Sequence, residues 1–396
     1  MKSKIFTILF FFSTVLAAET KDYVISVLTI GPGSSLSDSF GHSAIRVQDK
    51  SKNYDLVFNY GVYDFNDPNF YSNFIKGYLN YSLGVSYYKD FKSSYISNNR
   101  SIKEQVLLLP DVLNKKIADR LIFNSKTENK NYRYDYFSNN CSTIIKDIID
   151  ESLIDYDYEN DYIVENKGKN TYRNLIYENI NKNSWGSLGI DICLGSYIDQ
   201  EIDVKKNTFL PEYLFEYLNS SYYKHPDLSN KIKLVKKNNF INYENKEFQN
   251  LNSNNLFYSP LFIFIIISSF LLFLSSRDLN NKVIHLILQS THIITSAIGF
   301  LLLFLWFFTD HFTSAYNYNL LWANPLNIIL IFKSINKKWK IALLKLLLLS
   351  LALIVLHSIT NVQVFNISLY PFFIFLAFRY LQLIKYYSKH DDLQSI

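Results

Sequence analysis

The chain contains few cysteines, glycines and prolines: 2, 11 and 8 of its 396 residues. The two cysteines, Cys141 and Cys193, are too few for a disulfide scaffold, although one bridge between them could form in an oxidising compartment. The 7 histidines are scattered, and no segment has the spacing of zinc ligands. The sequence therefore predicts no metal site and no cofactor.

A stripe of basic residues is also missing. The formal charge is +5, but Lys and Arg are interspersed with Asp and Glu, so nucleic acid is not an expected partner. Lys, Asn, Ile, Tyr and Phe are abundant throughout, which is typical of a general compositional drift. A single Asn or Lys is therefore weak evidence for a site.

The first 18 residues have the order of a secretory signal peptide. Lys2 and Lys4 precede the apolar run Ile5–Leu16, and the small residues Ala17 and Ala18 follow. The alternative is an uncleaved first transmembrane helix, which the short run makes less favourable. Both interpretations place the next residues outside the cytoplasm.

Long apolar runs return only in the last third of the chain. Most approach or exceed the roughly 17–25 residues that an α-helix needs to cross a bilayer. The third is short and contains Pro325, which suggests a tilted or partly re-entrant element. We therefore expect about five transmembrane helices within residues 259–385, in the runs 259–275, 283–308, 319–333, 341–358 and 364–384.

Basic residues between the runs predict the orientation, because Lys and Arg favour cytoplasmic loops. The loops 309–318 and 359–363 contain no Lys or Arg. The alternate loops and the predicted cytoplasmic tail 386–396 do contain them. This pattern places residues 19–258 on the periplasmic face of a bacterial inner membrane. The basic residues concerned are Arg277, Lys282, Lys333, Lys337, Lys338, Lys340, Lys385 and Lys389.

The sequence pattern of the exported residues 19–258 predicts an α+β domain. Its expected strands are Tyr23–Ile30, Ser43–Val47, Leu56–Tyr60 and Glu104–Leu109, and its expected helices are Asp111–Asn124 and Ser142 to about Leu153.

Cys141 is the candidate nucleophile, because it follows Asn139 and Asn140 at the start of a predicted helix. A helix N-terminus supplies unpaired N–H groups and a partial positive charge, which favour a thiolate and can bind an oxyanion. The alternative is a small buried hydrophobe. Cys193 lacks such a setting and is interpreted as a packing residue.

His42 is the candidate base. It opens the strand-like segment GHSAIRV after a glycine-bearing loop, whereas His285, His292 and His390 lie in a span or in the cytoplasm. His225 and His357 are expected to be solvated or interfacial.

A histidine that opens a strand, followed about a hundred residues later by Asn-Cys at a helix start, resembles the circularly permuted papain-like fold. NlpC-like hydrolases and the lecithin:retinol acyltransferase family share that arrangement. The more specific resemblance is to the Lnb family of lipoprotein N-acyltransferases, and the five following spans fit its layout. The matching segments are TIGPGSSLSDSFGHSAIRV (29–47), FNYGVYDFNDPNFYSNFIKGYLNY (58–81), YRYDYFSNNCSTIIKDII (132–149), WGSLGIDICLG (185–195) and TFLPEYL (208–214).

The resemblance implies transfer of an acyl chain to the α-amine of a diacylglyceryl-cysteine lipoprotein, with lipoproteins and membrane phospholipid as partners. His42 and Cys141 would be the catalytic pair. Asn59 is a candidate to orient His42, although a structural asparagine at a strand end is the simpler interpretation.

Polar residues on the exported side of the spans are candidates for substrate binding: Asp310, His311, Asn317 and Asn319. The alternative is that they are interfacial anchors.

Two other functions remain open for the whole chain. One is a Cys/His hydrolase of peptidoglycan peptides or lipid esters, and the other is a non-enzymatic envelope assembly or transport protein.

Overall fold

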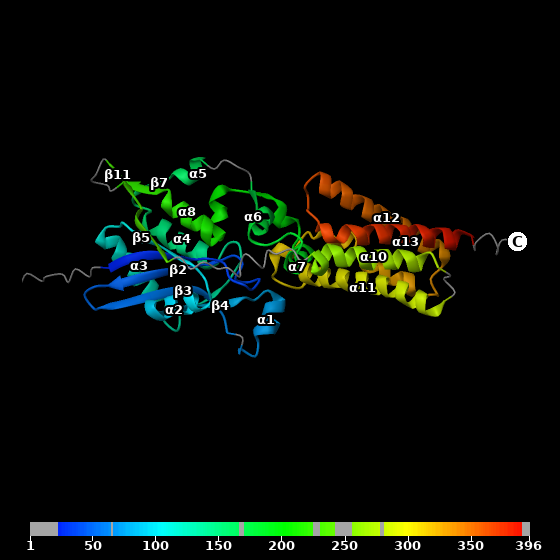
Figure 1. The fold of residues 1–396 in the computed structure, drawn as a ribbon, viewed down its shortest axis with the longest axis horizontal. Helices are drawn as coiled ribbons and strands as arrows, with labels where there is room; N and C mark the ends of the chain where they lie inside the picture. Colours follow the sequence, from blue (N-terminus) through cyan, green and yellow to red (C-terminus); the bar gives the residue numbers. More distant parts are fainter. Residues whose placement is uncertain are drawn as a thin grey trace, which may run out of the picture.

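The computed structural model describes residues 23–64, 66–165, 170–224, 230–241, 256–277 and 281–389. The predicted signal peptide, His225 and most of the predicted cytoplasmic tail lie outside these residues. The chain forms two parts placed end to end, a sheet domain followed by a helical domain (Figure 1).

A seven-stranded antiparallel sheet forms the centre of the sheet domain. Its strand order is β12-β5-β1-β2-β3-β4-β6. The predicted α+β class is confirmed by this mixture of strands and helices. The strands are β1 (Tyr23–Ile30), β2 (His42–Asp49), β3 (Tyr54–Val62), β4 (Asn80–Tyr87), β5 (Ile102–Leu107), β6 (Asn131–Arg133) and β12 (Val235–Ile241).

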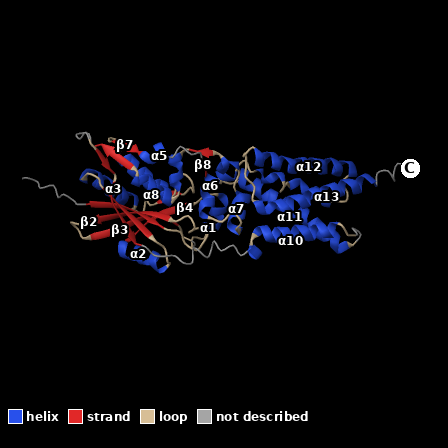
Figure 2. Cartoon of the chain, turned by 45° about the horizontal axis from the view of Figure 1, so that its top comes forward, coloured by secondary structure: helices blue, strands red, loops and turns tan. Residues whose placement is uncertain are grey.

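Helices cover both faces of this sheet (Figure 2). Ile25 and Val27 of β1 pack in the core that includes α3 (Asp111–Asn124), α4 (Cys141–Ser152) and α8 (Pro211–Asn219). Leu28 and Ile30 pack on the other face with Phe91 of α2 (Tyr88–Ser97). Because successive strand residues point to opposite faces, a strand buried on both sides reads as a continuous apolar run.

Smaller elements complete this domain. Two short sheets have the orders β11-β10-β7 and β8-β9. Their strands are β7 (Asp157–Asn160), β10 (Ser221–Lys224), β11 (Lys231–Lys233), β8 (Asn170–Thr171) and β9 (Glu201–Ile202), and the remaining helices are α1 (Phe70–Lys76), α5 (Asp161–Glu165), α6 (Tyr172–Asn179), α7 (Trp185–Cys193), η1 (Ser196–Asp199) and η2 (Val204–Phe209).

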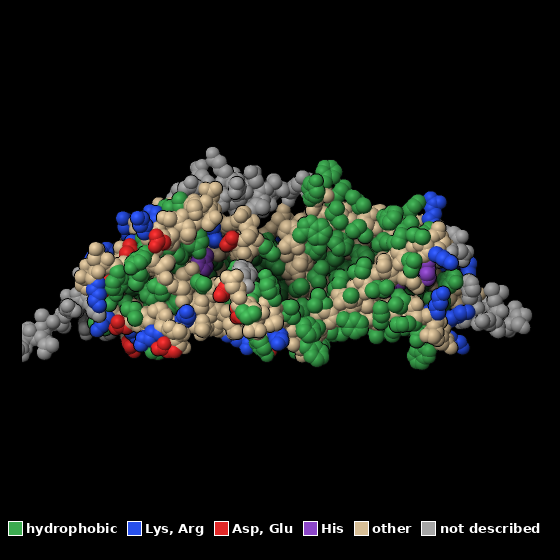
Figure 3. Space-filling model, turned by 90° about the horizontal axis from the view of Figure 1, so that it is seen from below, with side chains coloured by type: hydrophobic (Ala, Val, Ile, Leu, Met, Phe, Trp, Pro, Cys, Tyr) green, Lys and Arg blue, Asp and Glu red, His purple; other side chains and the backbone are tan. Residues whose placement is uncertain are grey.

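Four α-helices are described in the helical domain. Three of its segments, Lys282–Phe307, Lys337–Ile359 and Ile367–Lys389, are long and apolar enough to cross a membrane, and Pro260–Ser275 is a shorter apolar helix. Figure 3 shows an apolar band over this domain, with Lys and Arg gathered at its far end. The elements are η3 (Leu256–Tyr258), α10 (Pro260–Ser275), α11 (Lys282–Phe307), η4 (Phe312–Ser314), η5 (Tyr318–Leu321), η6 (Pro325–Ile331), α12 (Lys337–Ile359), η7 (Ile367–Leu369) and α13 (Tyr370–Lys389).

The third predicted span, residues 319–333, does not form the expected α-helix. It contains the 3₁₀ segments η5 and η6 instead. Asn327 lies against His292 of α11, and the backbone near Pro325 lies against Gly299, so the segment retraces α11. A 3₁₀-helix rises about 2.0 Å per residue and an α-helix about 1.5 Å, so these two segments extend further per residue than the expected α-helix would.

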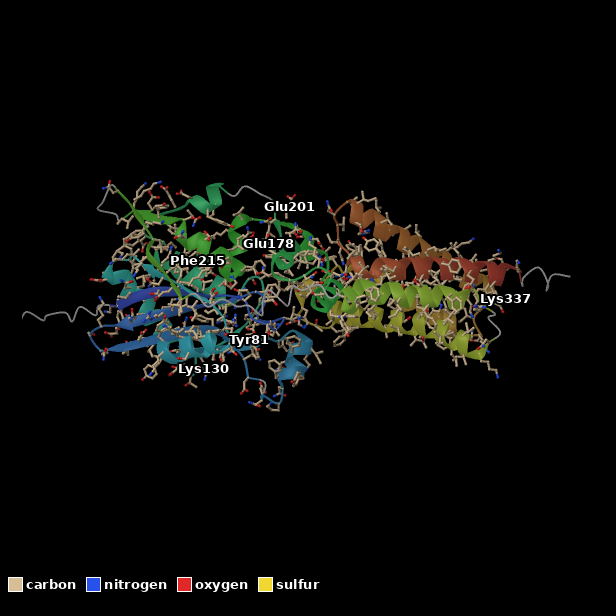
Figure 4. All side chains as sticks on the ribbon, viewed as in Figure 1. Tyr81, Lys130, Glu178, Glu201, Phe215 and Lys337 are labelled. Atoms are coloured by element: carbon tan, nitrogen blue, oxygen red, sulfur yellow. The ribbon has the colours of Figure 1, made fainter. Side chains whose placement is uncertain are left out.

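This orientation of the helical domain yields a prediction that reporter fusions can test. A fusion at Asn230 should be active outside the cytoplasm and one at Lys338 should be active inside, because lysines favour the cytoplasmic side. Lys337, the neighbour of Lys338, lies at the end of the helical domain far from the sheet domain (Figure 4). Paired periplasmic and cytoplasmic reporters at both positions would measure this, and the reverse pattern would contradict the topology.

Candidate active site

Cys141 occupies the first position of α4, and the preceding residue fixes where that helix begins. The Asn140 side-chain oxygen accepts the backbone N–H groups of Ser142 at 2.8 Å and Thr143 at 2.9 Å. The Thr143 hydroxyl in turn accepts the Asn140 N–H at 2.8 Å, which completes a capping box. The capped start of α4 therefore fixes the position of the Cys141 thiol.

The Asn140 cap also changes what the helix end can bind. It occupies two of the first N–H groups of α4, which the position at a helix start predicts to be free for an oxyanion. The expectation is wrong for Ser142 and Thr143, because an asparagine before the helix satisfies its own first turn. The Cys141 N–H remains as the helix donor nearest to the thiol.

His42 opens β2 and lies beside Cys141. Its Nε2 lies 2.5 Å from the Asn59 side-chain oxygen on β3, and its ring is hydrogen-bonded to the Cys141 thiol. Donation from Nε2–H to Asn59 leaves Nδ1 as the nitrogen that can accept the thiol proton. The structure thus brings together Cys141, His42 and Asn59.

A glycine with a positive φ lies beside this group. Gly61 has φ of +96°, a region that favours glycine, and lies at an irregularity in the pairing of β3 with β4. A Cβ atom on Gly61 would lie 3.9 Å from the Cys141 Cβ and 3.9 Å from the His42 Cε1. Both are ordinary van der Waals distances, so the positive φ, and not a lack of space, favours glycine beside the pair.

The electrostatics of the pair favour a thiolate and an imidazolium. Burial by itself raises the Cys141 pKa, but attraction to His42 and hydrogen bonds from His42 and the Ser43 backbone lower it overall. Burial by itself lowers the His42 pKa, yet Cys141 and the hydrogen bond with Asn59 raise it overall. Each group therefore favours the charged form of the other.

A pocket of about 520 Å³ is lined by the loop 33–38 and by residues 94–100, but not by His42 itself. Tyr95, which stacks against the His42 ring at 6.3 Å, and Arg100 both line it. Arg100 donates to the Gly31 carbonyl and pairs with Asp38, so it holds the loop before His42. Tyr95 and Arg100 were missed in the sequence because no motif distinguishes them from other aromatic or basic residues.

Three tyrosines lie near the thiol in the segment before α4. Burial and the nearby Cys141 raise the pKa of Tyr136 and of Tyr134 well above the ordinary tyrosine value. The Tyr136 hydroxyl is buried and has no hydrogen-bond partner within the described part of the chain. Tyr132 packs with Cys141 against the main core.

Comparison with known families covers both parts of the chain. The family model of the Lnb N-terminal periplasmic domain matches residues 16–176, and that of the Lnb transmembrane domain matches residues 252–390. The chain belongs to the Lnb family. It is therefore a membrane protein with a periplasmic domain, and His42, Asn59 and Cys141 all fall within the matched periplasmic part of this Lnb protein. No curated protein and no solved structure matches the chain.

The family membership confirms the expected resemblance to Lnb proteins. The permuted papain-like arrangement and the number of spans stay predictions. Cys141 and Cys193 are both free, so the disulfide considered from the sequence is absent. Burial raises the Cys193 pKa, which is the opposite of the effect at Cys141.

The four polar residues predicted near the membrane divide into two pairs. Asn317 and Asn319 are 1% and 0% exposed, and their amides donate to backbone carbonyls of α7. These two asparagines therefore fasten α7 to the helical domain, and their contacts give no support to a role in substrate binding. Asp310 pairs with Arg133 at 2.5 Å, and His311 donates to the Phe74 carbonyl at 2.9 Å.

The opposite pKa shifts of the two cysteines predict different reactivities. Cys141 should react with iodoacetamide near neutral pH, and its rate should fall only as the pH drops through its lowered pKa. Cys193 should react appreciably only in alkaline solution. Mass spectrometry of the two cysteine peptides across pH measures both rates. His42→Ala should slow the alkylation of Cys141 at pH 7, by about tenfold for each unit by which the Cys141 pKa rises.

Equal pH profiles for Cys141 and Cys193 would contradict this account of the pair. Cys193 is the internal control, because it lies in the same chain and is also partly buried.

The hydrogen bond at 2.5 Å predicts that Asn59 orients His42. Asn59→Ala should lower the His42 pKa and cut the rate of Cys141 acylation by about 10- to 100-fold, part of the 10²–10⁴ that a general base contributes. Asn59→Asp should retain more activity, since it keeps an acceptor oxygen. The pH–rate profile measures the shift, and an unchanged rate and profile in Asn59→Ala would assign Asn59 a purely structural role.

Proposed function

We propose that this Lnb-family chain is a lipoprotein N-acyltransferase of the bacterial inner membrane that uses Cys141 as a covalent nucleophile. The observation that carries the proposal is the Cys141–His42–Asn59 group, in which the thiol begins a helix and touches a histidine that a second hydrogen bond orients. Family membership supports a role in lipoprotein maturation, and the membrane spans suit substrates that are lipid-bound.

The first half-reaction forms a thioester. His42 accepts the proton of Cys141, and the thiolate attacks the carbonyl carbon of an acyl ester on a membrane lipid or on the lipoprotein's diacylglyceryl group. The C–O bond to glycerol then breaks, and the imidazolium returns its proton to the departing glyceryl oxygen. The acyl chain is now bound to Cys141 and an alcohol has been released.

The second half-reaction forms the amide. The α-amine of the lipoprotein's N-terminal cysteine attacks the thioester, His42 accepts a proton from this amine, and the C–S bond breaks. The leaving thiolate and the imidazolium restore the starting pair. The Cys141 N–H and the buried Tyr136 hydroxyl are the donors that we assign to the oxyanion in both steps.

The central test compares single substitutions in a strain that expresses a reporter lipoprotein. Cys141→Ala and His42→Ala should each abolish N-acylation while the protein still accumulates in the membrane, because a nucleophile and its base act as a unit. Cys193→Ala is the matched control and should retain activity. Mass spectrometry of the reporter's N-terminal peptide measures the outcome.

Cys141→Ser sharpens the test. A hydroxyl is far less ionised than a thiol, so activity should fall by orders of magnitude, and any trapped acyl group should be an oxygen ester that resists hydroxylamine at neutral pH. Near wild-type conversion of the reporter by Cys141→Ala membranes would disprove the thiol mechanism. Release of free fatty acid without reporter acylation would instead identify a hydrolase.

A further inference from the structure

Five aromatic side chains connect the membrane boundary with the neighbourhood of Cys141 through successive ring contacts. We call this set the aromatic track. The ring centroids are 6.2 Å apart for Phe74–Phe70, 5.9 Å for Phe70–Tyr63, 5.1 Å for Tyr63–Tyr81 and 4.4 Å for Tyr81–Tyr134. The track belongs neither to the main sheet core nor to the proposed catalytic group.

The end of the aromatic track at Phe74 is attached to the loop that follows the membrane span α11. The Asp310 N–H donates to the Lys76 carbonyl at 2.8 Å, and His311 donates to the Phe74 carbonyl, so α1 rests on the loop that follows α11. Gly77, with φ of +80°, permits this approach, because a Cβ there would lie 2.8 Å from the Asp310 backbone. Figure 1 shows α1 at the junction of the two domains.

The surface of α1 is unusually apolar for a helix outside the membrane. Tyr71, Phe74 and Ile75 are 67%, 49% and 54% exposed, and no residue of α1 is buried. Phe307 and Phe308, at the attached end of α11, are 63% and 75% exposed. The apolar surface of the span thus continues onto α1, as expected for a helix that lies in the membrane interface.

The other end of the aromatic track, Tyr134, lies in the segment that precedes Cys141. The Tyr134 N–H donates at 2.8 Å to the carbonyl of Leu79, the residue before β4. The tight turn between Asp135 and Asn139 then brings the chain to Cys141 at the start of α4. Gly61, two residues before Tyr63 of the aromatic track, lies beside the thiol, because a Cβ atom there would be 3.9 Å from the Cys141 Cβ. Tyr81 lies in the half of the sheet domain nearer the spans (Figure 4).

We propose that the aromatic track binds a fatty acyl chain, ester-linked to glycerol, that leaves the outer leaflet beside α1 and delivers its carbonyl to Cys141. Aromatic rings suit this ligand because they cover methylene groups and demand no hydrogen bonds from them. This inference rests on the proposed function and adds the site of its lipid substrate. Asp310 and His311 then act by holding α1 at the membrane surface.

Photocrosslinking tests the binding site without requiring turnover. Full-length Cys141→Ala protein in nanodiscs is exposed to two probes with a diazirine in one acyl chain, phosphatidylglycerol and a diacylated lipopeptide. We expect adducts in the peptides of α1 and β4 and none in α3. Phe70→Ser should reduce them by about tenfold, whereas Phe123→Ser, at a 56% exposed position on α3, should not.

The two probes distinguish the source of the chain, because the one that gives the adducts is the lipid that enters the aromatic track. Adducts spread equally over α3 and α1, or unchanged by Phe70→Ser with both probes, would overturn the proposal.

A second measurement separates this inference from the proposed function. In the otherwise wild-type protein, Phe70→Ser and Tyr81→Ser should slow Cys141 acylation by a long-chain lipid at least about tenfold. Acetylation of Cys141 by a small soluble thioester should stay within about twofold of wild type. Equal loss with both acyl donors would mean damage to the pair, and no loss with either would remove the role of the aromatic track.

Failure of the proposed function gives a different result. In that case wild-type Cys141 would form no acyl adduct with either donor, whereas the crosslinking pattern would still decide whether the acyl chain occupies the aromatic track.

Discussion

One buried carboxylate, Asp191, joins the two domains of this protein. It pairs with Arg173 of α6 and accepts hydrogen bonds at 2.7 Å from Tyr177 and at 2.7 Å from Asn366 of the helical domain. The Arg173 and Asp191 side chains are 1% and 0% exposed, and Arg173 also pairs with Asp199. Removing one partner from such a cluster typically costs about 3–5 kcal/mol, because a buried charge is left uncompensated.

This joint limits how the periplasmic domain can move relative to the membrane. The backbone carbonyl of Asp191 accepts the Asn319 amide at 2.8 Å, and the Gly195 N–H donates to the Thr313 carbonyl at 2.8 Å. Because α1 is also bonded to the loop after α11, the sheet domain is held at two separate places. Cys141 therefore has a fixed position relative to the ends of the spans, which a reaction on membrane-bound lipids would require.

Elements with a strong local signal were predictable from the sequence. The strand Tyr23–Ile30 and the helix Asp111–Asn124 have the predicted bounds, because apolar periodicity dominates both segments. His42 and Cys141 could be paired because each stands at the start of a regular element. Their contact with Asn59 depends on the register of β2 and β3, which one sequence does not specify.

Roles that depend on tertiary contacts could not be predicted from the sequence. Asn317 and Asn319 read as polar groups at a membrane boundary, but their partners lie on α7, more than a hundred residues earlier. The 3₁₀ segment at 325–331 could not be distinguished from a short α-helix, since it depends on packing against α11. The same limit applies to α1, because the proposed role of its exposed aromatic residues depends on the position of α1 beside a membrane span.

The surroundings of Cys141 bear on the choice between transfer and hydrolysis. The proposed thioester would lie among Tyr132, Tyr134 and Tyr136, whose rings limit the approach of water from that side. The polar pocket lined by Tyr95 and Arg100 does not include His42, and the Tyr95 ring, which stacks against His42, is the contact between the two. Transfer would exceed hydrolysis if the amine were bound beside His42, because a positioned nucleophile reacts faster than water from bulk solvent.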